Sequence, residues 1–523
     1  MPATSRRWWT LFAMSGALTM VMVDGTGVSV ALPHIQRSLG LDQGALQWVI
    51  TAFSLTLAAT LATGGRLGDL LGRVRVLVTG VLLFAIGSIV CSVAPNLIVL
   101  LTGRVLEGFG NVLMIPAAAV LVTEAFDPKD RGKAMGLYTI LGSVFMVLGP
   151  IIGGLLVEFV SWRAVFLVNI PIAAVVLILV RIARPEDHPP IPQPLRISHT
   201  FLLMAALTAL VLGLQQSHRW HWTSPWTIGL LVGGIALLAV FVWTQLKAAE
   251  PLLDVRLFTD RGYVGDAVVL YTAQFALIGQ VAFNAIYLQN ILGFTPFHSG
   301  LALLLLLLPW MLMAPVAGWL FDRFGLKLPA VIGMACVTLG FFLEAQTFPY
   351  RHFAYVAPCM LLIGAGLGLA LPQTYTDGMS RVSPNRRGQA FGVLDTLRQV
   401  GSAMGMAIIG TVVAAQELPK LAPMAEKFAT APEEKAELQT TLLEAVRGQD
   451  GAGAKLRERW PAALNELKES GARSIADGYL VGSSVTGLGL LLALILVARK
   501  QSDANADAGL PATIASIEVP ADS

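Results

Sequence analysis

Ionisable side chains inside long apolar stretches are the residues of this sequence best placed to do chemistry. Asp24 lies well within the apolar run at residues 8–32, and glycines flank the nearby Thr26 on both sides. A charge near the middle of a lipid-embedded helix is costly, so each such residue is a candidate for function. A low-dielectric site favours the protonated carboxyl, which suits reversible proton uptake. We predict that Asp24 exchanges protons; a purely structural ion pair with Arg104 is the alternative.

Two acid–base pairs share this apolar setting. Arg104 and Glu107 lie three residues apart in LTGRVLEGFG, and Asp395 and Arg398 repeat the spacing in a later run. Residues at this spacing share one face of a helix, so each pair can form an internal ion pair. Arg104 can also bridge Glu107 and Asp24. Two roles stay open for these pairs: a static ion pair, or the coupling of protons to a substrate.

Three polar side chains, Gln280, Asn284 and Tyr287, follow one another at spacings of four and three in another apolar run. This spacing places them on one face of a helix. They either line a substrate cavity or hydrogen-bond to neighbouring helices, as polar residues within membranes commonly do. The spacing alone does not separate these two roles.

A glycine-rich stretch interrupts the apolar run at residues 135–157. Proline removes a backbone hydrogen bond and bends a helix, while glycines permit close helix crossings. This face is either ordinary helix packing or a surface that seals against a second half of the molecule and opens during a cycle. Matching glycines at Gly405 and Gly410 favour the second role. The residues concerned are Gly142, Gly149, Pro150, Gly153 and Gly154.

Signatures of enzymes and of nucleotide or metal sites are missing from the sequence. There is no GxxxxGK[ST] phosphate-binding loop, which argues against direct ATP drive by this chain. The seven histidines form no metal-type spacing such as HExxH. We therefore expect no enzymatic activity, no cofactor, no metal site and no nucleic-acid partner.

The composition indicates that these residues lie in membrane-spanning helices. Hydrophobic residues make up 55% of the chain and charged residues 13%, about half the charged share of a soluble domain. Apolar runs of about 20 residues, the length that a bilayer helix needs, recur fourteen times, which puts both termini on one side. Lys and Arg concentrate in the short loops on that side, which predicts that both termini are cytoplasmic.

Internal repeats divide the chain into halves. Residues 131–154 and 387–410 share identical residues at one constant offset, and 318–328 repeats the charged hairpin at 65–77 at nearly the same offset. Two repeats in the same order indicate a parallel duplication, which is typical of transporters.

The predicted fold is an all-α polytopic membrane protein with two six-helix halves and two extra spans between them. The first half covers residues 1–185, and the linker with the extra helices covers 186–255. The second half covers 256–523. It includes a polar extracytoplasmic insertion at 416–475 and a short polar tail at 501–523, which we expect to be disordered.

Several motifs together resemble one known family. GRLGDLLGRVR is similar to the loop 2–3 motif of the major facilitator superfamily, RVLEGFG to its span 4 motif and LGPIIGG to the antiporter motif of span 5. Three further stretches resemble the fourteen-span drug:proton antiporter subfamily: VDGTGVSVALP, WRAVFLVNIPI and YLQNILGFTPFHSG. The likeness covers nearly all of residues 8–415 and the last span.

The resemblance implies proton-driven export of lipophilic, cationic or otherwise toxic small molecules across a bacterial inner membrane by alternating access. It implies that Asp24 is the acid of the span 1 motif and that Arg104 is the buried arginine linked to proton coupling. Glu107 stands where the family usually has glutamine, and Asp395 where a neutral residue is expected. Either departure can change proton stoichiometry or substrate charge. The residues that match the latch of the cytoplasmic side are Gly65, Asp69, Gly72, Arg73 and, in the second copy, Asp322.

Two rival functions remain open at this stage. One is a dedicated exporter of a single endogenous metabolite, siderophore or lipid-like product. The other is a transport-inactive sensor or scaffold that holds a periplasmic partner through residues 416–475. Buried acids argue against a scaffold, because it has no reason to tolerate their cost. The sequence predicts neither the substrate nor the oligomeric state.

Overall fold

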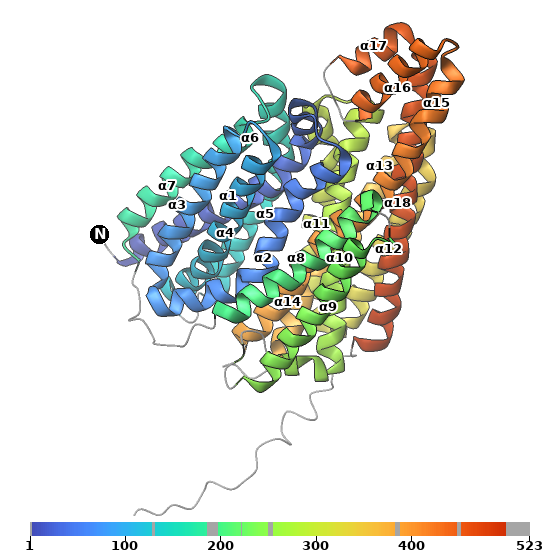
Figure 1. The fold of residues 1–523 in the computed structure, drawn as a ribbon. Coiled ribbons are helices and arrows are strands. Elements are labelled where there is room, and N and C mark those ends of the chain that lie inside the picture. Colours follow the sequence, from blue (N-terminus) through green and yellow to red (C-terminus); the bar gives the residue numbers. More distant parts are fainter. Residues whose placement is uncertain are drawn as a thin grey trace, which may run out of the picture.

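Helices account for every regular element in the described part of the chain, which confirms the all-helical fold class. In the computed structural model they form two bundles side by side, with a small group of helices at one end (Figure 1). The structure describes residues 3–127, 131–185, 197–220, 222–248, 251, 255–381, 387–446 and 451–497.

The first bundle is built from the N-terminal helices. They are α1 (Ala3–Leu39), α2 (Gln43–Leu71), α3 (Arg73–Ser92), α4 (Leu97–Ala125), α5 (Arg131–Phe159), α6 (Ala164–Leu167) and α7 (Asn169–Ala183). Side chains cap several of these helices, as when Oδ1 of Asp42 accepts a hydrogen bond from the backbone N–H of Ala45 at 2.8 Å.

The second bundle repeats this pattern further along the chain. Its elements are η1 (Val255–Thr259), α10 (Arg261–Ile286), η2 (Tyr287–Ile291), α11 (Pro296–Phe324), α12 (Lys327–Thr347), η3 (Phe348–Tyr350), α13 (Phe353–Ser380), α14 (Arg387–Glu417) and α18 (Pro461–Leu496).

Twelve of the described helical segments are long and apolar enough to cross a membrane. In α2 and in α8 (Ile197–Trp220) the apolar segments are shorter, Gly44–Leu57 and Ser198–Leu214. The protein is therefore a multi-pass membrane protein, while the count of fourteen spans stays a prediction.

The repeated glycines allow equivalent close helix contacts in both bundles. A Cβ on Gly149 would collide with Thr26 of α1, and a Cβ on Gly405 would collide with the backbone of Phe275 on α10. One helical turn on, Gly154 of α5 lies against α11, and Gly410 of α14 lies against α2. Each repeat thus packs one glycine against its own half and one against the opposite half.

The charged hairpins also match in backbone shape. Gly72 ends α2 with φ of 91°, and Gly325 ends α11 with φ of 76°. An L side chain rarely adopts such angles, so glycine at both places allows the sharp turn into the next helix. The sequence repeat is therefore a repeat of local geometry.

The extra helices α8 and α9 (Pro225–Lys247) form a hairpin beside the two bundles. Helix α8 packs against α2 of the first bundle and α14 of the second. The hydroxyl of Thr411 on α14 donates a hydrogen bond to the carbonyl oxygen of Leu214 at 3.5 Å. The hairpin contacts both halves along the seam between them.

The polar insertion folds into short helices at one end of the molecule (Figure 1). We call α15 (Leu421–Phe428), α16 (Pro432–Val446) and α17 (Ala452–Arg459) the cap, and this end the cap end. The cap has its own apolar core, which includes the fully buried side chains of Leu438 and Leu456. It also reaches the first half, because Nε2 of Gln36 on α1 donates to the carbonyl oxygen of Val446 at 3.0 Å.

Candidate functional site

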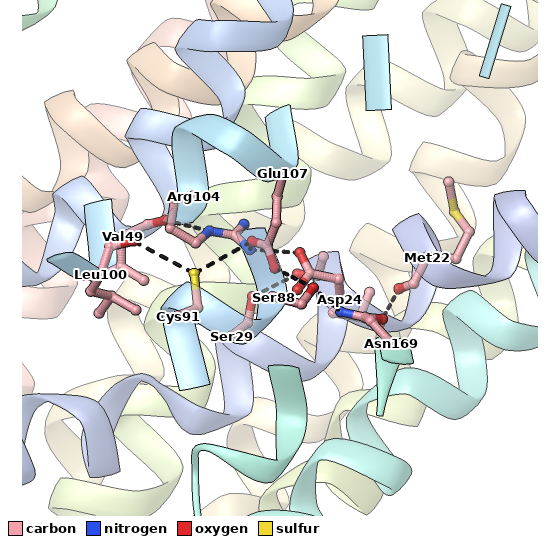
Figure 2. A network of polar contacts seen from close by, with 12 residues as sticks. Met22, Asp24, Ser29, Val49, Ser88, Cys91, Leu100, Arg104, Glu107 and Asn169 are labelled. Atoms are coloured by element: carbon pink, nitrogen blue, oxygen red, sulfur yellow. Dashed lines mark hydrogen bonds and ion pairs between the residues drawn. The ribbon is translucent and has the colours of Figure 1, made fainter. Parts of the chain in front are cut away.

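Three ionisable side chains from two helices meet inside the first bundle (Figure 2). Nη1 of Arg104 on α4 lies 2.7 Å from Oδ2 of Asp24 on α1 and 2.6 Å from Oε2 of Glu107. All three residues are buried, with exposed fractions of 1% or less. The structure therefore brings the predicted residues of the first half together, and Arg104 bridges both acids.

Polar groups of three further helices hold this cluster in place. The hydroxyl of Ser88 on α3 donates to Oε1 of Glu107 at 2.7 Å, and Nδ2 of Asn169 on α7 donates to that hydroxyl oxygen at 3.1 Å. Nε of Arg104 donates to the carbonyl oxygen of Val49 on α2 at 3.1 Å. The sequence reasoning did not identify Ser88 or Asn169, because small polar residues in apolar runs are common.

The charge balance of the cluster is its main chemical feature. One guanidinium faces two carboxyl groups, so the cluster would carry a net negative charge if both acids were ionised. An uncompensated charge buried away from water is costly, whereas one added proton makes the cluster neutral. Oδ1 of Asp24 is buried and has no hydrogen-bond partner in the described structure. The arrangement can bind one proton between two acids.

Two aromatic rings lie beside Arg104, and the cluster lies outside the cavities of the structure. The guanidinium carbon of Arg104 lies 4.5 Å from the ring centre of Phe53 and 5.9 Å from that of Phe166. Such contacts favour a cation. Two cavities of about 370 and 310 Å³ lie elsewhere, and the cluster lines neither of them. In this conformation the three ionisable groups are closed off.

The predicted pair of the second half forms a separate and more open site. Nε of Arg398 lies 2.7 Å from Oδ1 of Asp395, and the hydroxyl of Tyr375 donates to the same oxygen at 2.5 Å. The Arg398 side chain keeps 26% of its surface exposed. Unlike Arg104, this arginine has one acid in its ion pair.

The polar residues of α10 and η2 are buried between helices. Nδ2 of Asn284 donates to Oε1 of Gln280 at 2.8 Å, and the hydroxyl of Tyr287 donates to the carbonyl oxygen of Phe348 at 3.0 Å. These three residues line neither of the two cavities. Gln280 and Asn284 also donate to Glu344 of α12 and Tyr479 of α18, so these contacts join separate helices, and a role in a substrate cavity stays a prediction.

The comparisons with known proteins can now be set beside this geometry. Residues 14–406 match the model of the Major Facilitator Superfamily. The chain belongs to the major facilitator superfamily. Among its relatives is the multidrug resistance protein Stp of Mycobacterium tuberculosis, which is 32% identical over 87% of this chain and 86% of that protein.

Other relatives support the same family, and a solved structure shares its fold. The puromycin resistance protein pur8 of Streptomyces alboniger is 33% identical over 78% of this chain and 82% of that protein. The methyl viologen resistance protein SmvA of Salmonella typhimurium is 32% identical over 78% of this chain and 83% of that protein. A bacterial homologue of the human lysosomal transporter Spinster, solved facing inward, covers 94% of this chain and 98% of that chain, with a TM-score of 0.62 at 17% identity. This last likeness shows the shared fold.

The charged motif at residues 65–77, which joins α2 to α3, lies at the end of the molecule opposite the cap. Arg73, the first residue of α3, pairs with Glu124 near the end of α4. Gly65 and Asp69 belong to the last turns of α2, and the side chain of Asp69 lies outside the described residues. Asp322 lies in the last turn of α11. The latch role assigned to these residues stays a prediction.

Most glycines of the α5 motif pack against α1 within the first half. Gly142 and Gly149 lie against α1, where an added Cβ would collide with Leu18 and Thr26, and Gly153 lies against Gly27.

Pro150 and Gly154 instead face the second half. A Cβ on Gly154 would lie 2.7 Å from the carbonyl oxygen of Pro296, and a Cβ on Gly300 would collide with the carbonyl oxygen of Pro150. Only this part of the motif lies at the seam, so most of the predicted sealing surface is packing within one half.

Buried acids of the second half were missed by the sequence reasoning. Asp266 of α10 shares Arg381 with Asp377 of α13, at 3.2 and 2.6 Å. Glu344 of α12 is fully buried and accepts a hydrogen bond from Gln280. Both acids stand in apolar runs, so the rule applied to Asp24 could have found them. They lie near the ends of their runs, where an exposed position was the simpler interpretation.

No group of three or more described His, Cys, Asp or Glu residues is arranged to hold a metal ion. The three cysteines, Cys91, Cys336 and Cys359, are free. Sγ of Cys91 lies 3.8 Å from Oε2 of Glu107, at the edge of the cluster.

Proposed function

We propose that this protein is a proton-coupled exporter of small lipophilic or cationic toxic compounds. The proposal draws its substrate class from relatives named for multidrug, puromycin and methyl viologen resistance. It draws proton coupling from the buried ionisable cluster of the first half. Proton movement down its gradient supplies the energy, and no cofactor takes part.

The observation that carries the proposal is one guanidinium shared by two buried carboxyls, Asp24 and Glu107. In the closed arrangement the cluster is stable with one proton. When α1 moves relative to α4, Asp24 separates from Arg104, meets water and changes its protonation. Because proton and substrate then prefer different conformations, uptake of one favours release of the other.

The exchange takes place between two halves that rock against each other. The seam at the cap end is closed here by contacts such as that of Gly154 with Pro296, and the hydroxyls of Ser54 and Ser402 lie 2.9 Å apart across the seam. Opening of this seam and closure of the opposite end would expose the substrate site to the other side.

The orientation follows from the charge of the loops. Both termini and the hairpin motif lie in the cytoplasm, and the cap lies outside a bacterial inner membrane. The bilayer, protons and a small-molecule substrate are then the partners, and the cap is the surface open to an outer-face partner.

The decisive variant is Asp24→Asn, which keeps the side-chain shape and removes the titratable acid. In membrane vesicles loaded with ethidium, we expect gradient-driven efflux to fall at least tenfold, while exchange without a gradient continues. Glu466→Gln, which removes a partly exposed acid paired with Lys427 at 2.6 Å, serves as the matched control. Full gradient-driven efflux by Asp24→Asn would remove Asp24 from the mechanism.

A dedicated exporter of one product is the second candidate. The tetracenomycin C resistance and export protein of Streptomyces glaucescens is 32% identical over 79% of this chain and 77% of that protein. Stabilisation of the purified protein by a panel of unrelated lipophilic cations favours the broad exporter. Stabilisation by a single product of the host cell, and by no cation of the panel, favours the dedicated one.

A further inference from the structure

Glu344 is a buried acid with no cation beside it among the described residues. It lies near the cap end of α12 with no exposed surface, and Nε2 of Gln280 donates a hydrogen bond to its Oε2. Among the described residues, no Lys, Arg or His forms an ion pair with it. An ionised carboxylate buried without a counter-charge costs several kcal/mol, so the neutral acid is the stable form at this place.

Among the described residues, the side chains that interact with Glu344 are uncharged. They are Gln280 and Asn284 of α10, Tyr287 of η2, Cys359 of α13 and Tyr479 of α18. The ring of Tyr479 stacks on Phe341 at 4.9 Å and meets the edge of Phe348 at 4.8 Å. Arg351 acts on the neighbouring Tyr287, and its Nη1 donates a hydrogen bond to Oδ1 of Asn465 at 2.6 Å.

Two buried acceptors without donors point to a proton on the carboxyl. Oε1 of Glu344 and Oδ1 of Asn284 are both buried and have no hydrogen-bond partner in the described structure. Nδ2 of Asn284 already donates to Gln280 and, at 3.3 Å, to the hydroxyl oxygen of Tyr479. The donors left nearby are the hydroxyl of Tyr479 and the second N–H of Gln280, and neither forms a hydrogen bond to either acceptor in the described structure. Buried acceptors without donors are rare and costly, and an acid O–H supplies the missing donor.

We propose that Glu344 is a second proton-binding site of this transporter, located in the half that lacks the Asp24 cluster. The site takes a single proton, which Glu344 binds, and the hydrogen-bond network of Gln280, Asn284 and Tyr479 surrounds the carboxyl. This inference rests on the proposed proton-coupled export and adds a second proton to it.

The chemistry of the site is a simple ionisation. When α10, α12 and α18 separate enough to admit water, the acid O–H bond breaks, the proton passes to water and a hydrated carboxylate remains. Closure around the carboxylate is unfavourable until a proton returns, because no cation of the described structure is paired with it. Glu344 would therefore make closure of the second half depend on proton uptake at the cap end.

The test compares Glu344→Gln with wild type in proteoliposomes. The amide keeps the shape of the neutral acid and supplies N–H donors, so we expect a folded protein that still moves ethidium. The number of protons exchanged per ethidium, measured from the pH difference that balances a set ethidium gradient, should fall by one. The control Glu466→Gln should match wild type.

Infrared spectroscopy tests the protonation state without transport. Wild type at neutral pH should show a carboxylic-acid carbonyl band from Glu344 in addition to that of the Asp24 cluster, and this added intensity should be absent from Glu344→Gln and present in Glu466→Gln. If the amide variant does not fold, Glu344→Leu provides the same spectral comparison, because loss of a neutral acid leaves no unpaired charge.

The outcomes separate this inference from the proposed function. An unchanged proton count in Glu344→Gln, or a carboxylic-acid band whose intensity Glu344→Gln does not reduce, overturns the role of Glu344 while coupling through Asp24 stands. Wild-type efflux that ignores the proton gradient overturns the proposed function itself.

Discussion

The two halves of this transporter keep buried acids in different ways. In the first half, Arg104 neutralises Asp24 and Glu107 within one cluster. In the second half, Glu344 is surrounded by amides and aromatic hydroxyls. An acid beside a guanidinium can change its charge when the pair separates, whereas an acid among neutral donors keeps its proton until water enters. In the proposed mechanism, a duplicated fold thus holds two proton sites of different chemistry.

The largest expected effect comes from removing the cation of the first half. Arg104→Met leaves two buried acids without a counter-charge, and breaking such a pair typically costs about 3–5 kcal/mol. We expect transport to be abolished and the melting temperature to fall by several degrees. Efflux and thermal unfolding measure the two effects.

Arg398→Met is the matched control, because its arginine is paired with one acid and remains partly exposed. It should lose less stability than Arg104→Met. Equal losses in the two variants would contradict the contrast between the halves.

A smaller effect is expected from the second acid of the cluster. Glu107→Gln keeps a partner for Ser88 and leaves Asp24 as the only acid on Arg104. One cation and one acid are then neutral without a proton, so export should continue with weaker dependence on the proton gradient. Vesicle efflux at several external pH values checks this. A gradient dependence equal to that of wild type would show that Glu107 does not share the proton.

The packing of the halves gives a third comparison. Gly154→Ala places a methyl group 2.7 Å from the carbonyl oxygen of Pro296, and overpacking of this kind costs about 1–3 kcal/mol. We expect a several-fold loss of transport in a folded protein, because the closed seam at the cap end is disfavoured. Gly233→Ala in α9, where an added Cβ meets nothing within 4 Å, should transport normally. Equal activity of both variants would contradict the role of this contact.

The smallest effect is expected in the cap, away from both proton sites. A hydrogen bond from Lys455 lowers the pKa of Glu437, which also pairs with Arg459 at 2.5 Å. A lowered pKa in the folded state gives stability that is present above the unfolded value, about 4.3, and is lost as the pH falls. Glu437→Gln should therefore reduce this acid-side sensitivity of unfolding and leave transport at neutral pH unchanged. Loss of transport in Glu437→Gln would show that the cap takes part in the transport cycle.

Much of this architecture could be predicted from the sequence. Hydropathy predicted the helices. The internal repeat predicted the two halves, because duplicated glycines such as Gly149 and Gly405 make equivalent helix contacts in each half. The presence of a charge within an apolar run identified Asp24 and Arg104 as candidate functional residues. These are features that one chain segment carries by itself.

The partners of each residue could not be predicted in the same way. Only the structure shows that Asn169 supports Glu107 through Ser88, since these residues belong to three different helices. The spacing of Gln280 and Asn284 placed them on one face, but the acid that this face meets, Glu344, lies on another helix. Contacts between distant segments depend on helix rotation, which one sequence does not specify.

The most direct measurement is proton release by purified protein when ethidium binds in weakly buffered detergent solution. Wild type should release protons, Asp24→Asn and Glu344→Gln should each release fewer, and the double variant should release none. Release from the double variant equal to that of wild type would contradict the claim that these two buried acids carry the protons of the cycle.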